Sequence, residues 1–312
     1  MLLLRIVGVV GSIALVVALV DVQLLWERAQ QISLPIVALA LGVNLVRQAF
    51  IAWRWKTMNT NEGSHRFGEY FLFILASRPA GLLLPGLLGF DLARGVMIGG
   101  TSSEGRAEHL VSVLSDRVVG LSSVILIGMG AALAAPQFPS RLKYVGILSV
   151  LLSGFVVGLL VSGSPVLHRA LSGLLGKLGT VGAKVSEGLA LWMRIVSFFR
   201  RNPARIGKAL VACGLIHLSW FLIAWVLSEN LGLGLSFWVI TTVTALSWVV
   251  LAVPVSWMGL GVNELSFIFL LSFQGVAAES AAALSIHQTV INVAFSILCI
   301  PLLLFVGKRK SA

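Results

Sequence analysis

Long apolar runs separated by short polar segments make up most of this chain. A membrane-spanning helix needs about 20 mostly apolar residues. Seven runs are long enough to span: residues 2–20, 34–53, 109–134, 144–163, 208–228, 235–254 and 280–306. Two further apolar stretches, residues 69–100 and 262–278, are interrupted or shorter. We therefore predict an all-α fold, a polytopic membrane helical bundle of about eight spans with two broken or re-entrant segments.

Both interrupted stretches set proline and glycine beside an acidic residue. The first reads GLLLPGLLGFDLARG (residues 81–95) and contains Asp91, and the second reads VPVSWMGLGVNELSF (residues 253–267) and contains Glu264. A broken helix in hydrocarbon survives only where its free backbone groups line a cavity or pack against protein. Paired breaks in two halves of a chain are typical of transporter binding sites. We expect the two stretches to form one polar site.

Composition supports a single membrane domain over residues 1–312, because 58% of the residues are hydrophobic and 11% are charged, against about 25% charged in soluble proteins. The net charge of +11 lies in basic residues between the apolar runs, as the positive-inside rule requires. We expect these residues to face anionic lipid headgroups and not nucleic acid. Their distribution favours a plasma-membrane protein with an even number of crossings and both termini in the cytoplasm.

Residues 164–208 form the longest polar segment, and they carry many basic residues and one acidic residue, Glu187. Apolar residues recur there every three or four positions between Leu171 and Phe199, which predicts a cytoplasmic basic amphipathic segment at the membrane surface. Frequent glycines weaken a single long helix, so a short helical hairpin packed on the bundle is an equal alternative.

Arginines within or beside the apolar runs are candidate headgroup ligands. An ionisable group at membrane depth is costly and faces a cavity or a partner, and a guanidinium binds phosphate through two hydrogen bonds. We assign headgroup binding to Arg78, Arg94 and Arg117. Arg47 has two open interpretations, snorkelling toward the interface or facing a cavity. The run Trp53-Arg54-Trp55-Lys56 is typical of an interfacial anchor.

Asp91, Asp116 and Glu264 are candidate pairing or gating groups for lipid translocation. Each has a structural alternative. Asp91 and Arg94 are three residues apart and would pair on one helix face, Asp116 would pair with another helix, and Glu264 would cap a half-helix that begins near Asn263. Polar residues of the last run either line the same cavity or bond across helices: His287, Gln288 and Asn292.

Catalytic and nucleotide-binding motifs are absent from the sequence. It contains no H-x-x-x-H pair, no G-x-S-x-G and no Walker-type loop. We therefore expect no metal, no cofactor and no enzymatic activity. Transport would be driven by an ion gradient or run downhill.

Four motifs in this order resemble a flippase-like membrane family that includes the transmembrane region of lysylphosphatidylglycerol synthetases: NLVRQAFIAWRWKTM (44–58), GFDLARG (89–95), SDRVVGL (115–121) and PVSWMGLGVNE (254–264). The family often has Gly-Gly-Asp where Gly89-Phe90-Asp91 stands here. Since no aminoacyl-transfer domain follows Lys310, we expect translocation without lipid lysylation. The resemblance implies movement of a phospholipid, a polyprenyl-linked sugar or a similar amphiphile between leaflets.

The sequence thus favours a lipid translocase with membrane lipids as partners, and leaves its oligomeric state open. Two alternatives from other classes stay open: a secondary transporter of a small anionic solute, and a membrane scaffold for a lipid-modifying or glycosyl-transfer enzyme. A lateral opening lined by apolar residues would favour lipid over solute. An integral enzyme is a fourth reading, which chemical change of a lipid by the purified protein would favour.

Overall fold

The computed structural model describes residues 2–59, 65–83, 103–138, 141–162, 164, 179–252 and 259–303. These residues contain twelve helices and no strand. The helices are α1 (Leu2–Leu19), α2 (Val22–Ala29), α3 (Leu34–Met58), α4 (Phe67–Ser77), α5 (Ala80–Leu83), α7 (Ser103–Ala134), α8 (Arg141–Ser162), α10 (Gly179–Arg201), α11 (Pro203–Asn230), α12 (Phe237–Leu251), α13 (Val262–Ser272) and α14 (Ala278–Leu298).

The predicted all-α membrane bundle is confirmed. Within the described ranges, five helices are long and apolar enough to cross a membrane: α3, α7, α8, α11 and α14. The α1–α2 pair, bent by 95°, makes a sixth if it counts as one span. Two runs of the expected eight-span arrangement, residues 235–254 and 262–278, form the shorter helices α12 and α13. The span count is therefore five or six in this part of the chain.

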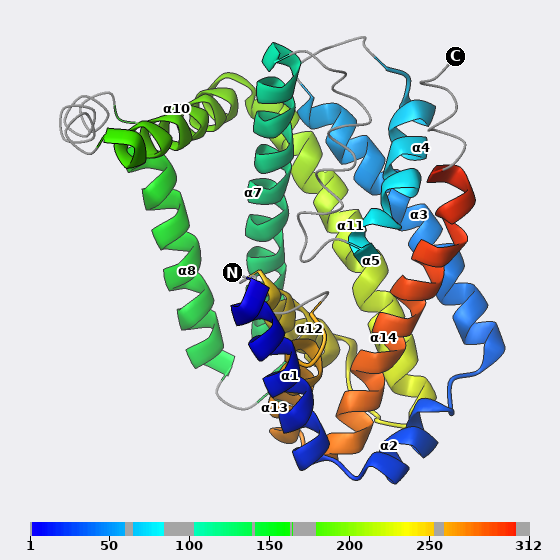
Figure 1. The fold of residues 1–312 in the computed structure, drawn as a ribbon. Coiled ribbons are helices and arrows are strands. Elements are labelled where there is room, and N and C mark those ends of the chain that lie inside the picture. Colours follow the sequence, from blue (N-terminus) through cyan, green and yellow to red (C-terminus); the bar gives the residue numbers. More distant parts are fainter. Residues whose placement is uncertain are drawn as a thin grey trace.

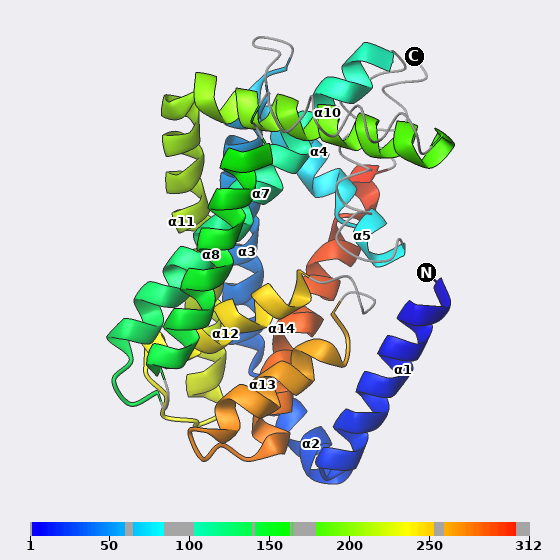
Figure 2. The same ribbon diagram turned by 90° about the vertical axis from the view of Figure 1, so that its left-hand side faces the viewer.

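Side-chain hydrogen bonds identify which helix ends lie together. Asn59 after α3 bonds Tyr70 of α4, with Nδ2 and Oη 2.6 Å apart, and Arg205 of α11 donates to the Asn59 carbonyl oxygen over 3.1 Å. We call this end of the bundle the α10 end, because α10 runs across it (Figures 1 and 2). The opposite end, which α2 crosses, is the α2 end; there Asn230, the last residue of α11, donates to the Gln31 carbonyl oxygen over 2.9 Å.

The second interrupted stretch is a re-entrant hairpin. Gln137, just after α7, donates to Ser236 Oγ at the start of α12 over 2.6 Å. Its carbonyl oxygen accepts from Gln274, just after α13, over 3.4 Å. Since α12 starts and α13 ends at the same place, the chain enters the bundle from the α2 end and turns back (Figure 1). Residues 253–258 of this turn lie outside the described residues.

The first interrupted stretch is described as far as Leu83. Helix α4 runs inward from the α10 end, and the short helix α5 follows it (Figure 1). The rest of the stretch, including the predicted site residues Asp91 and Arg94, lies outside the described residues.

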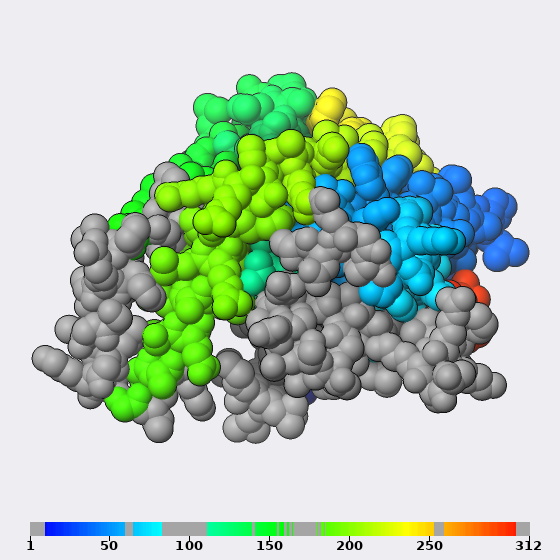
Figure 3. All heavy atoms as spheres, turned by 90° about the horizontal axis from the view of Figure 1, so that it is seen from above, coloured from blue at the N-terminus to red at the C-terminus, as the bar shows by residue number. Residues whose placement is uncertain are grey.

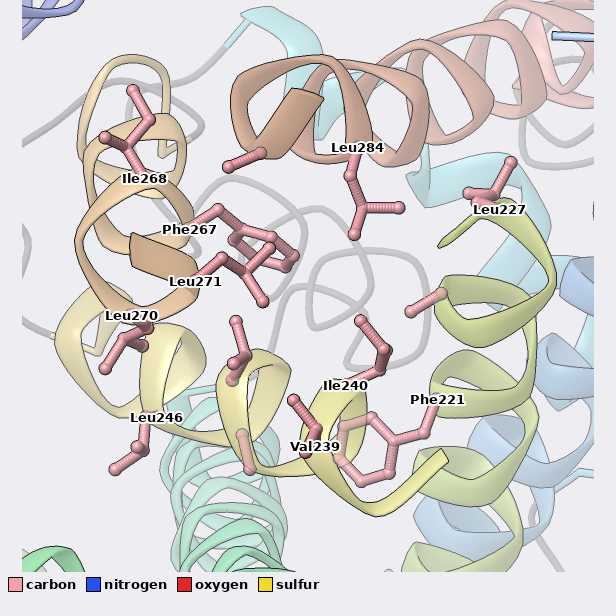
Figure 4. Packing of buried hydrophobic residues seen from close by; sticks show 14 of the residues in the cluster. Phe221, Leu227, Val239, Ile240, Leu246, Phe267, Ile268, Leu270, Leu271 and Leu284 are labelled. Atoms are coloured by element: carbon pink, nitrogen blue, oxygen red, sulfur yellow. The ribbon is translucent and has the colours of Figure 1, made fainter. Parts of the chain in front are cut away.

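The largest apolar cluster joins α11, α12, α13 and α14 at the α2 end. In Figure 4, Phe267 and Leu271 of α13 point toward Leu284 of α14 and toward the α12 side chains, and Phe221 of α11 closes the other side. A close approach connects this cluster to α7: a Cβ atom on Gly128 would lie 3.0 Å from Cβ of Ala245 in α12. Small residues at helix contacts permit such approach in membrane bundles.

Helix α1 lies to one side of the bundle and packs against α13 (Figure 2). Ser12 Oγ donates to the Leu260 carbonyl oxygen over 3.3 Å, just before α13 begins. The next residue, Gly261, has a φ of +78°, and a Cβ atom there would overlap the Ser12 side chain. Glycine is therefore required at position 261 both for its backbone conformation and for contact with α1.

The described part of the polar segment 164–208 contains helix α10 and the start of α11. Figure 3 looks onto the α10 end, where α10 (green) lies beside the α3–α4 region (blue to cyan). Ile195, Val196 and Phe198 are buried, and Arg194, Arg200 and Arg201 are exposed. One face of α10 thus packs on the bundle, and its basic residues face outward.

Candidate functional site

A buried ion pair joins α3 to α7. Arg54 Nε lies 2.6 Å from Asp116 Oδ1, and Arg54 Nη2 donates to Asp116 Oδ2 over 3.0 Å. The two side chains are 12% and 2% exposed. The pair thus combines one hydrogen bond, from Nη2, with a close charge contact at Nε. Of the two interpretations of Asp116, pairing with another helix is the one that these contacts support.

The surroundings of Arg54 favour this geometry. Its Nη1 also donates to Cys213 Sγ of α11 over 3.2 Å. A Cβ atom on Gly120 of α7 would lie 3.2 Å from Nη1, so the glycine leaves room for the guanidinium. The expected interfacial anchor at residues 53–56 is wrong for Arg54 and Trp55, since both face the interior, and Trp55 is 1% exposed.

Arg47 lies two helical turns before Arg54 on α3 and faces two tryptophans. Its guanidinium carbon is 4.8 Å from the ring centre of Trp220 in α11 and 5.8 Å from that of Trp248 in α12. Nη1 donates to Asn44 Oδ1 over 3.3 Å. Arg54 and Arg78 are close enough for their charges to act on it. Arg47 therefore points into the bundle and does not snorkel toward the interface; whether it faces a cavity stays a prediction.

The two tryptophans are held in place by neighbouring polar and aromatic groups. Trp220 Nε1 donates to Gln288 Oε1 of α14 over 3.1 Å. Trp248 packs against Phe221 and His217, with ring centres 5.7 and 5.5 Å away. His217 Nε2 is in turn 2.9 Å from Ser123 Oγ of α7. These contacts fix a rigid aromatic surface beneath Arg47.

Arg78 follows α4, where the first interrupted stretch begins. Its Nη2 donates to Asn292 Oδ1 of α14 over 3.3 Å. Gln288 and His287 also bond across helices, and His287 Nε2 lies 2.8 Å from the carbonyl oxygen of Ala29, the last residue of α2. All three polar residues of the last span thus make interhelical hydrogen bonds, one of the two roles predicted for them.

Glu264 belongs to a separate polar group at the start of α13. Its Oε2 accepts from the Gly261 backbone N–H over 2.6 Å, and its Oε1 accepts from Ser285 Oγ over 3.0 Å. Asn263 bridges Ser285 and Ser247 of α12, with hydrogen bonds of 2.8 and 2.5 Å. The carboxylate caps the half-helix, as expected for a residue three positions into it.

The predicted site residues therefore divide into two groups. Asp116 and Arg78 join an arginine group with Arg54 and Arg47, while Glu264 lies in the α13 group. Adjacent residues of α12 connect the two, since Ser247 bonds Asn263 and Trp248 lies under Arg47.

Arg117, a further predicted site residue, lies on α7 beside Asp116 and is half-buried. The described residues bring no three metal-ligating side chains together.

Sequence reasoning left Arg47 undecided and assigned Arg54 to the interface. A usable signal was present in α3, where the buried residues Asn44, Gln48, Ile51 and Trp55 recur at spacings of three and four. Polar residues on the buried stripe of a membrane helix indicate a polar interior.

Comparison with known proteins gives one match. A family model described as the lysylphosphatidylglycerol synthase TM region matches residues 2–299. Neither the curated proteins nor the solved structures contain a match to the chain. Since the family model covers nearly the whole chain, the protein belongs to the lysylphosphatidylglycerol synthase TM region family of membrane proteins linked to lipid handling.

Proposed function

We propose that this protein is a lipid translocase, which binds a phospholipid, a polyprenyl-linked or a similar amphiphilic lipid and moves it across the plasma membrane. The observation that carries the proposal is the arginine group in the interior of a bundle with an apolar exterior. Arg47 is 11 residues from the end of α3, or about 17 Å by helix rise, which is about half of a hydrocarbon core of ~30 Å.

Charged groups at that depth are costly and mark substrate pathways in membrane proteins. The exterior suits lipid contact, because Leu142, Val150 and Val157 of α8 are 69%, 72% and 55% exposed. An amphiphile has the same two parts, a polar headgroup for the interior and acyl chains for the apolar surface. The family's link to lipid handling supports this choice over a small anionic solute.

We assign the α10 end to the cytoplasm. Lys56, Arg66, Arg200, Arg201 and Lys208 are exposed there, and basic residues accumulate on the cytoplasmic side of membrane proteins. Fewer basic residues lie toward the α2 end: Arg28, Arg141 and Lys143. A cationic cytoplasmic face would also attract anionic headgroups to the protein.

Reconstitution in liposomes with headgroup-labelled lipids tests the proposal. Leaflet exchange is followed by quenching the outer leaflet, with wild type beside Arg78→Gln and the control Lys56→Gln, which removes an exposed charge from the basic end of α3. We expect wild type and Lys56→Gln to exchange lipid and Arg78→Gln to exchange it more slowly. Absence of exchange under every ion gradient tested would favour the solute transporter or the scaffold instead.

A further inference from the structure

We propose that Arg47, stacked on Trp220 and Trp248, binds the phosphate group of an anionic lipid headgroup. The inference rests on the proposed lipid-translocase function and names the headgroup chemistry that this site would take.

Arg47 lacks a counter-charge among the described residues. Asp116 binds Arg54 at two points, whereas Arg47 has no carboxylate partner among the described residues. Its polar contact is the neutral amide oxygen of Asn44, and its Nε has no hydrogen-bond partner. A buried charge is stable only when it is paired and hydrogen-bonded, so Arg47 lacks the anion that its charge and donors require.

The N–H donors of Arg47 point away from the rings that it stacks on. A guanidinium carries five N–H donors in its own plane, and the tryptophans contact it through ring faces. Stacking therefore holds the group by its face and leaves its edge available. Two parallel N–H groups at that edge fit two phosphate oxygens. The hydrogen bond from Trp220 to Gln288 keeps this surface in place before any ligand binds.

A second positive charge lies near Arg47. Arg78, which follows α4, is close enough for its charge to act on Arg47, whereas the charge of Arg54 is balanced by Asp116. Like charges in a low dielectric repel each other, and an anion beside Arg47 relieves that repulsion. Arg47 as a whole residue is half-buried, and its Nε is a buried atom. A headgroup without a phosphate or another anionic group would gain none of these interactions.

Ligand binding by the purified protein tests the inference. Thermal stability in detergent is measured with phosphatidylglycerol, with a phosphate-free neutral glycolipid, and with inorganic phosphate. The variants are Arg47→Gln and Arg47→Lys, and the matched control is Arg194→Gln, which removes an exposed guanidinium on α10. We expect Arg47→Gln to weaken phosphatidylglycerol binding by about tenfold or more and Arg47→Lys to weaken it less. Arg194→Gln should bind phosphatidylglycerol as wild type does. The glycolipid should stabilise wild type and Arg47→Gln equally.

The two sources of phosphate give different results. Stabilisation by phosphatidylglycerol beyond that by inorganic phosphate, lost in Arg47→Gln, supports the lipid headgroup. If inorganic phosphate stabilises the protein as much as phosphatidylglycerol does, and Arg47→Gln abolishes both effects, the site binds phosphate and its ligand is a free solute. Equal phosphatidylglycerol binding by wild type and Arg47→Gln overturns the inference. A double-mutant cycle in lipid-free protein gives a second test. A coupling free energy of unfolding between Arg47→Gln and Asp91→Asn would also overturn the inference, because the chain itself would then supply the anion.

Leaflet exchange on the same preparations separates this inference from the proposed function. If wild type exchanges lipid but phosphatidylglycerol binding is unchanged in Arg47→Gln, the translocase proposal stands and the Arg47 site is wrong. If phosphatidylglycerol binding depends on Arg47 but wild type exchanges no lipid, the Arg47 anion site stands and the translocase proposal is wrong.

Discussion

Gly261 and Ser12 lie so close that position 261 has no room for a side chain, and this contact joins α1 to the turn that starts α13. Replacing Gly261 with alanine adds a Cβ that overlaps Ser12 and forces a left-handed backbone on a residue that disfavours it. We expect Gly261→Ala to lower the free energy of unfolding by about 2 kcal/mol or more, measured by thermal unfolding in detergent.

Gly42→Ala is the matched control for this prediction. Gly42 lies in α3, and nothing is within 4 Å of a Cβ atom added there. We expect a change between zero and a gain of about 1 kcal/mol, because alanine favours helix. Equal effects of the two substitutions would contradict the contact between α1 and α13.

The Arg54–Asp116 pair should behave as one unit. Removing either partner leaves a buried charge without its counter-charge, so Arg54→Gln and Asp116→Asn should each destabilise by about 3–5 kcal/mol. The double variant removes both charges and should lose less than the sum of the two. Unfolding of all four proteins in one detergent measures the coupling, and strictly additive losses would show that the pair is not formed.

Glu264 should contribute mainly as a helix cap. Glutamine retains one oxygen acceptor for Gly261 N–H or Ser285, so Glu264→Gln should lose about 1 kcal/mol of stability. Glu264→Leu leaves both donors without an acceptor and should lose about 2–3 kcal/mol. The ratio of the two losses is the readout. A larger loss for the glutamine variant than for the leucine variant would mean that the carboxylate charge has a partner besides these donors.

The arrangement of the helix ends predicts which sites share a side of the membrane. Single cysteines at Gln137 and Gln274 should react with an impermeant thiol reagent from outside the cell, and those at Lys56 and Arg200 only after the cytoplasmic side is opened. Cys213 and Cys299 are buried and should not react. Labelling of positions 274 and 56 from the same side would rule out the hairpin of α12 and α13.

Much of the fold was predictable because membrane helices must satisfy their backbone groups internally and span a fixed thickness. The runs 34–53, 208–228 and 280–306 therefore correspond to α3, α11 and α14. Glu264 as a cap was also within reach, since a carboxylate near a helix start meets free N–H groups. The span count was harder, because α12 and α13 are apolar like spans but turn back inside the bundle.

The arginine group could not be derived from sequence in the same way. Trp-Arg-Trp-Lys at the end of a run has the composition of an interfacial anchor, and only the packing of α7 against α3 places Asp116 opposite Arg54. Arg47 meets Trp220 and Trp248 from two other helices. Such contacts depend on how distant helices pack, which local periodicity does not encode.

The re-entrant hairpin changes the length of the barrier that a polar group must cross. Helix α13 has 11 residues, so it extends for about 16 Å, whereas the hydrocarbon core is about 30 Å thick. The start of α13, where Glu264 accepts from the Gly261 N–H, therefore lies short of the far side of the hydrocarbon and places polar groups partway through its thickness. A headgroup that reaches these groups from the α2 end has a shorter dehydrated passage left than one that crosses the whole core.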